Sequence, residues 1–275
     1  MLSVIDGEGW LWDYANKCDD CGAKQIGEGL AADPELKARG VKAGSFALHA
    51  THSHTSPDFP GGWGFVPDWS MQQVTETIKA NAKKAVLAME PARLEVGTED
   101  ARRHNSERRA TYRSAEEPDL NWLRAVSAKG GRTIATLGAF AAHPVTRNHE
   151  IGVAHPDWPG YFARRAEQRF FGIARHAMTG LGNVTGAKDE EHDKAVDVTR
   201  IGTGTALADL IPAVGDQRLA GLPAAELRAR PGRDAGAGVR RQRLRVRQLR
   251  GQLRDRPLRR GYGPGGEATG MAELR

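Results

Sequence analysis

Two histidines spaced two residues apart, His52 and His54, are the residues of this sequence best suited to bind a metal ion. They lie in the stretch Ala-Thr-His-Ser-His-Thr-Ser-Pro, residues 50–57, and a strand is expected from Val41 to His54. Residues two apart on a strand face the same side, so His52 and His54 would point together while His49 points away. Two such imidazoles can bind one zinc ion, or one can bind the metal while the other contacts a substrate. The alternative is a pair of histidines with ordinary structural partners.

A third histidine, His143, follows a run of small and apolar residues over 133–142 that predicts a buried strand. A polar residue at the end of a buried strand lies where ligands often bind in α/β folds, although a histidine can also simply end a strand. Further along, the loop 182–186 contains glycines and offers the hydroxyl of Thr185 as a nucleophile. A plain turn, or a glycosylation sequon at 183–185, is the alternative for that loop.

Strands and helices are expected to alternate along residues 1–216. Apolar residues recur at helical spacing after Asp68, which we expect to cap that helix, and Pro91 ends it. Other expected elements are a short strand at 4–5, a helix over 24–38, a strand over 93–96, a helix that Asp157 caps and that runs to Phe171, and a strand over 177–181. This alternation predicts an α/β fold of mixed α+β layers.

The composition is that of a globular protein. The 275 residues, 39% of them hydrophobic, are enough for one or two domains with a hydrophobic core. No stretch has the apolar length of a transmembrane segment, and the first residues lack the features of a secretory signal. Cys18 and Cys21 form a Cys-x-x-Cys pair, which we expect to be two separate thiols. A redox pair or half of a zinc ribbon is the alternative.

The C-terminal stretch, residues 217–275, differs from the rest of the chain. From Arg218 onward it contains 15 Arg, no Lys and five acidic residues, a net charge of +10, whereas the whole chain carries +6. A basic tail can bind nucleic acid. Such arms more usually mix Lys with Arg and add stacking aromatic residues, and Tyr262 is the one aromatic residue here. We therefore expect a disordered or irregular tail, read out of frame from a GC-rich gene, and no nucleic-acid partner.

The ordered set of motifs resembles the neutral/alkaline ceramidase family. Residues 50–57 are similar to the family's Thr-His-Thr-His-Ser-Gly-Pro motif, and Gly182-Asn183-Val184-Thr185 is similar to its nucleophile loop. Three further segments are similar to parts of the family's catalytic domain: 91–97, 142–146 and 155–161. The resemblance runs from Val4 to Gly186 or slightly beyond.

The resemblance implies a zinc-dependent amide hydrolase. His52 and His143 would bind Zn²⁺, and His54 would lie beside the metal and position the scissile carbonyl. Thr185 stands where the family has its nucleophilic serine, and Arg109, in a loosely aligned stretch, would contact the substrate. The family hydrolyses ceramide to sphingosine and a fatty acid, so the implied substrate is a lipid or another N-acyl amide.

The family's two remaining zinc ligands, a glutamate and a tyrosine, lie downstream of its nucleophile loop and have no counterpart in this sequence. We therefore expect residues 1–216 to be an incomplete catalytic domain with little or no activity. The family's complete members are often secreted or membrane-associated, but the sequence specifies neither location nor oligomeric state.

Three other interpretations compete with this one: a different class of metal hydrolase, a non-enzymatic nucleic-acid-binding protein and a non-functional gene remnant. Amidohydrolase barrels also begin with His-x-His on an early strand, but they need later metal ligands, and the tail contains no histidine. Metallo-β-lactamase folds need His-x-His-x-Asp-His, which fails here because Asp58 lies four residues after His54. The non-enzymatic alternative is a nucleic-acid-binding protein with a basic tail.

Overall fold

A computed structural model describes residues 1–14, 17–62, 64, 66–107, 119–145, 153–182, 184–186 and 196–213. All of them lie in the first of two compact units, Met1–Gly232. The predicted tail, together with Arg109 and Asn183, lies outside the described residues. The predicted domain boundary at residue 216 therefore stays a prediction.

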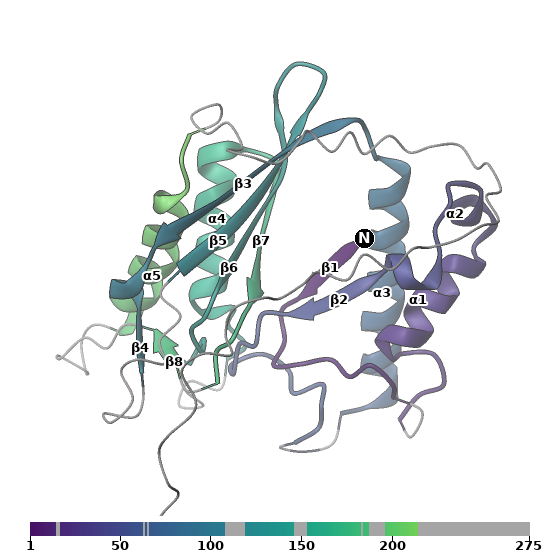
Figure 1. Ribbon diagram of the computed structural model, residues 1–275. Coiled ribbons are helices and arrows are strands. Elements are labelled where there is room, and N and C mark those ends of the chain that lie inside the picture. Colours follow the sequence, from purple (N-terminus) through teal and green to yellow (C-terminus); the bar gives the residue numbers. More distant parts are fainter. Residues whose placement is uncertain are drawn as a thin grey trace, which may run out of the picture. The chain divides into compact units, whose positions relative to one another are not determined.

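The N-terminal part combines two parallel strands with three helices. Strand β1 (Leu2–Ile5) pairs with β2 (Ala47–Ala50), which follows the 3-10 turn η1 (Ala43–Ser45). Helices α1 (Ala23–Ala32), α2 (Pro34–Ala38) and α3 (Asp68–Leu87) gather beside this pair (Figure 1). Their shared core consists of Ile26, Leu30, Leu36, Phe46, Ile78, Ala82 and Val86. Burial of these side chains fixes the C-terminal end of β2, where the histidine motif begins.

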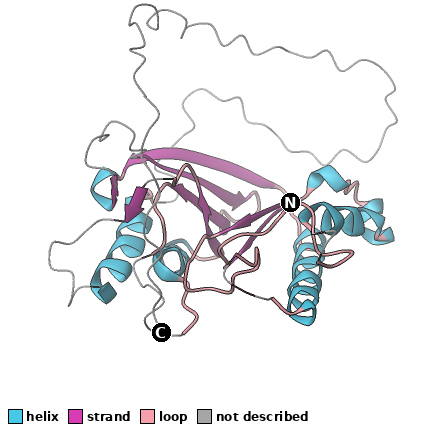
Figure 2. Cartoon of the chain, turned by 90° about the horizontal axis from the view of Figure 1, so that it is seen from below, coloured by secondary structure: helices cyan, strands magenta, loops and turns pink. Residues whose placement is uncertain are grey.

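A mixed four-stranded sheet forms the second part. Its order is β3-β5-β6-β7, with bounds Ala92–Asp100, Asp119–Ser127, Thr133–Phe140 and Ile173–Met178. The first three strands are antiparallel, whereas β6 and β7 are parallel and are joined through helix α4 (Asp157–Phe170). Helices α4 and α5 (Val196–Leu210) lie on the same side of this sheet (Figures 1 and 2). The core between them includes Trp122, Phe140, Trp158, Phe162, Leu207 and Ile211.

A second strand pair lies close to the end of this sheet. Strand β4 (Asn105–Glu107), which follows the 3-10 turn η2 (Arg102–His104), pairs antiparallel with β8 (Val184–Gly186). His143, three residues after the end of β6, also forms an isolated parallel β-bridge with Thr185 of β8. Strand β8 thus connects the β4 segment to the chain that leaves β6.

A buried ion pair joins the sheet to the end of α5. Arg124 on β5 is fully buried, and its Nε atom donates to Glu95 Oε2 on β3 at 2.8 Å. Arg124 also donates to the carbonyl oxygens of Pro212, at 2.8 Å, and Ala213, at 3.1 Å. Its guanidinium lies over the Phe170 ring at 4.9 Å. Because most of its donors face protein acceptors, Arg124 can be buried while charged.

The α/β fold class predicted from the sequence is confirmed, with corrections to single elements. The helix expected over 24–38 is two helices, because Asp33 leaves helical geometry and caps α2 by accepting from the amides of Glu35 and Leu36. The prediction that Asp68 is a cap is wrong: Asp68 is the first residue of α3 and Pro67 precedes it as N-cap. Asp157 likewise opens α4, although its Oδ1 does accept from the amide of Trp158.

The two cysteines differ from the expectation of separate thiols. Cys18 and Cys21 form a disulfide, with Cα atoms 5.8 Å apart, just before α1. Cys21 is buried with Tyr14, Phe59 and Met71. The bridge therefore closes a short loop against the segment that follows the histidine motif.

Among the described helices, none combines the length and the apolar character needed to cross a bilayer.

Candidate metal and hydrolase site

His52 and His54 lie just beyond β2, not on it. The strand ends at Ala50, and His52 has a positive φ of 63°, a conformation that is uncommon outside glycine. The expected strand up to His54 is therefore wrong. The two histidines still come together, because the turn at His52 brings the rings to the same side, and His49 points elsewhere, with its Nε2 accepting from the amide of Met178 at 2.6 Å.

Main-chain contacts fix the position of His52. Its amide donates to the carbonyl oxygen of Gly7 at 2.8 Å, which continues the β1–β2 pairing beyond the strands. Its Nδ1 lies 2.6 Å from the carbonyl oxygen of Glu8. A carbonyl can only accept, so Nδ1 carries the proton and Nε2 keeps its lone pair. His52 thus presents Nε2 as a metal-binding atom.

His143 has the same arrangement on the other side of the site. It follows the buried residues Ala141 and Ala142 after β6 and is itself 8% exposed. Both its amide and its Nδ1 lie 2.9 Å from the carbonyl oxygen of Val184 on β8. Nδ1 is therefore the protonated nitrogen here too, and Nε2 is left for a ligand.

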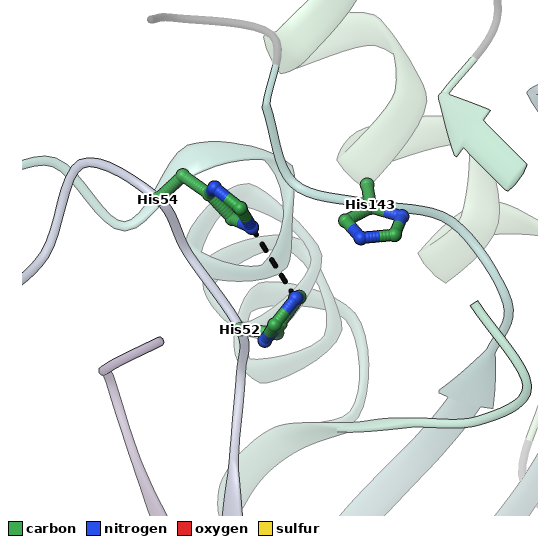
Figure 3. A group of neighbouring side chains, drawn as sticks. All are labelled: His52, His54 and His143. Atoms are coloured by element: carbon green, nitrogen blue, oxygen red, sulfur yellow. Dashed lines mark hydrogen bonds between the residues drawn. The ribbon is translucent and has the colours of Figure 1, made fainter. Parts of the chain in front are cut away.

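The three imidazoles converge from two separate segments of the chain (Figure 3). The Nε2 atoms of His52 and His54 are 3.2 Å apart. Ring centroids of His143 lie 5.1 Å from His52 and 5.7 Å from His54, and one ligand atom from each residue lies within 4.8 Å of the others. Two nitrogens bound tetrahedrally to one zinc at roughly 2.0–2.1 Å would be roughly 3.3 Å apart. The donor set therefore fits a metal ion: the His52–His54 pair already has the required spacing, and the His143 ring would move toward the other two on metal binding.

Further hydrogen bonds join the histidine loop to the chain around His143 and α4. The amide of His54 donates to Pro144 O at 3.3 Å. The hydroxyls of Ser53 and Thr55 both donate to the carbonyl oxygen of His155 at 2.8 Å. These contacts cross about a hundred residues of sequence, and they hold the two halves of the site together.

Asp6 is hydrogen-bonded to the start of the histidine loop. Its Oδ1 accepts from the Thr51 hydroxyl at 2.7 Å. Burial raises the pKa of the Asp6 carboxyl, while the Thr51 hydrogen bond lowers it. No sequence motif pointed to Asp6, because only its pairing through β1 brings it to the histidine segment.

Thr185 lies next to His143 through a parallel backbone bridge. It belongs to β8, so the expected loop over 182–186 is partly strand. Its side chain is half-buried. The structure thus places the backbone of Thr185 beside that of His143, whereas Arg109 and the loop residue Asn183 lie outside the described residues.

Comparison with known proteins agrees with the motif resemblance at the level of the fold. No protein-family model and no curated protein sequence matches the chain. Among solved structures, the neutral ceramidase from Pseudomonas aeruginosa is similar with a TM-score of 0.56 at 19% identity, covering 68% of this chain and 34% of that one. A ceramidase complexed with C2 gives a TM-score of 0.55 at 18% identity, covering 67% and 33%.

The chain thus spans about a third of the length of the solved structures it matches. An amidohydrolase barrel would be a closed ring of parallel strands, whereas the strands described here form an open mixed sheet and two strand pairs. The chain has a fold similar to part of a neutral ceramidase.

Proposed function

We propose that this chain carries a zinc-dependent hydrolase site for N-acyl amides, with ceramide as the substrate class. The observation that carries the proposal is the convergence of His52, His54 and His143 within a ceramidase-like fold. Three imidazoles, two of them with Nδ1 held by a main-chain carbonyl oxygen, are a common zinc ligand set.

The residues around the site have distinct tasks in this proposal. His52 and His143 hold the ion through Nε2, and His54 adds a third nitrogen. When bound, zinc supplies a Lewis acid that polarises an amide carbonyl. Thr185, adjacent to His143, offers its hydroxyl at the position where the resembled family has a serine. Its extra methyl group crowds the approach, so a slow reaction is expected.

Release of fatty acid from ceramide and from a short N-acyl amide tests the proposal, with zinc added and then removed by a chelator. We expect slow hydrolysis that requires zinc and disappears in the His52→Ala, His143→Ala double variant. Thr185→Ser should be at least as fast as the wild type, and Thr185→Ala slower. Hydrolysis that persists unchanged in the double variant would contradict the proposal.

A further inference from the structure

We propose that Glu8 is a positioning residue of the three-histidine site, because it faces the Nδ1 atoms of both His52 and His54. The inference rests on the proposed metal site. Glu8 lies three residues beyond β1, and its carbonyl oxygen is 2.6 Å from His52 Nδ1. Its carboxylate Oε1 is 3.9 Å from His54 Nδ1. One residue thus faces the nitrogen opposite the metal-binding atom in both histidines.

The chemistry of this arrangement is that of an outer hydrogen-bond partner. In the metal-bound protein an acceptor at Nδ1 holds the ring proton there, which leaves the Nε2 lone pair to the metal and fixes the ring orientation. Carbonyl oxygens do this for His52 and His143. For His54 the group facing Nδ1 is the Glu8 carboxylate, and its negative charge strengthens the imidazole as a ligand. At 3.9 Å the contact is electrostatic, and a small movement of the exposed His54 ring would make it a hydrogen bond.

The local structure holds Glu8 in this position. Parallel pairing of β1 with β2 ends at Ile5 and Ala50, and the amides of Thr51 and His52 then donate to the carbonyls of Ile5 and Gly7. A Cβ atom at Gly7 would approach Phe59 Cδ2 to 2.9 Å, so a side chain at this position would displace the buried Phe59 ring. The Glu8 side chain is 20% exposed, so most of it is shielded from solvent.

Two other ways in which Glu8 could affect metal binding can be distinguished from a positioning role. Glu8 could bind the metal directly, or it could attract a cation by its charge alone, without acting through His54. Both would leave an effect of Glu8 when His54 is absent, whereas a positioning role would not. A double-mutant cycle of Glu8→Gln with His54→Ala therefore distinguishes the positioning role from both alternatives.

The experiment measures Zn²⁺ affinity by competition with a chromophoric chelator, on the full chain. Glu28→Gln, on the exposed side of α1, is the matched control. We expect Glu8→Gln to weaken zinc binding by about 10-fold or more, with an unchanged melting temperature of the metal-free protein, and Glu28→Gln to bind like the wild type. In the His54→Ala background, Glu8→Gln should cause no further loss. The Co²⁺ absorption spectrum should keep its band positions in Glu8→Gln, because no ligand is lost.

Wild-type affinity in Glu8→Gln would overturn the inference while leaving the metal site intact. An equal loss with and without His54, or altered Co²⁺ bands, would also overturn it, because Glu8 would then act on the metal directly. Absence of zinc binding by the wild-type chain would instead refute the proposed function, and the role of Glu8 with it.

Discussion

His52 and His54 place their Nε2 atoms 3.2 Å apart, although neither residue lies on a strand. Two lone pairs at this distance repel unless a proton or a cation lies between them. In the metal-free chain one nitrogen must therefore donate to the other, and a bound cation would replace that hydrogen bond with two ligand bonds. The close pair is thus suited to exchange a proton for a metal ion.

This geometry predicts that His54 binds the metal itself. The His54→Ala variant should lose zinc affinity by more than the roughly 10–100-fold that follows loss of a ligand's hydrogen-bond partner. His104→Ala, which changes a histidine in η2, is the control and should bind normally. Isothermal titration with zinc measures both. Wild-type affinity in His54→Ala would restrict His54 to the substrate-positioning role that the resemblance implies.

The buried ion pair predicts a large loss of stability when one partner is removed. Arg124→Met leaves Oε2 of Glu95, a residue that is 3% exposed, and the carbonyls of Pro212 and Ala213 without the donors of Arg124. We expect the free energy of unfolding in urea to fall by about 3–5 kcal/mol. Arg93→Met removes only the exposed partner of Glu95 and should cost less than about 1 kcal/mol. Equal losses in the two variants would contradict the account of Arg124 as a buried anchor for the end of α5.

His176 predicts that stability falls in mild acid. Burial against Trp158 and Phe162, with a smaller contribution from His49, lowers the pKa of His176 to about 3. Because the unfolded chain binds this proton near pH 6.5, the stability contribution is complete above pH 6.5 and is lost progressively as the pH falls toward 3.

At pH 5 the loss from this residue is about 2 kcal/mol relative to pH 7.5. Burial also lowers the pKa of His49, which adds to the loss in the same direction. Urea unfolding of the wild type and of His176→Leu at both pH values measures the effect. The variant should lose less stability between pH 7.5 and 5, and an identical pH dependence in both proteins would show that His176 is not buried as a neutral imidazole.

Asp33 predicts a smaller and local effect. Its carboxylate caps α2 and also accepts from Lys83 Nζ on α3 at 2.8 Å, and the Lys83 hydrogen bond lowers the pKa of the carboxyl. Asp33→Ala should lower the free energy of unfolding measured in urea, because the amides of Glu35 and Leu36 lose their acceptor. Asp33→Asn keeps a capping oxygen and should cost less. A loss in Asp33→Asn as large as in Asp33→Ala would assign the stability to the exposed ion pair and not to the cap.

Long apolar patterns made part of the fold predictable from the sequence. The runs that form β6 and α3 are continuous and end at clear signals, so their existence and type were predictable. Strand β5 and helix α5 were not among the predicted elements. Helix α5 contains Gly202 and Gly204, which weaken a helical pattern. A Cβ atom at Gly204 would collide with the backbone of Trp158, so tertiary packing of α5 on α4 explains a residue that local propensity disfavours.

The histidines of the candidate site were predictable, whereas their supports were not. His52, His54 and His143 carry recognisable spacing or end an apolar run. The contacts of Glu8 and Asp6 with the histidine loop cross 44 and 45 residues, and they exist only because β1 pairs in parallel with β2. No local pattern encodes such a pairing register.

Metal content and zinc affinity of the purified chain, compared with those of a His52→Ala, His143→Ala double variant, test the central claim most directly. The three-histidine site predicts near-stoichiometric zinc in the wild type and none in the double variant, at similar stability of the metal-free proteins. Zinc that is absent from both proteins, or present equally in both, would contradict a metal site built from these histidines.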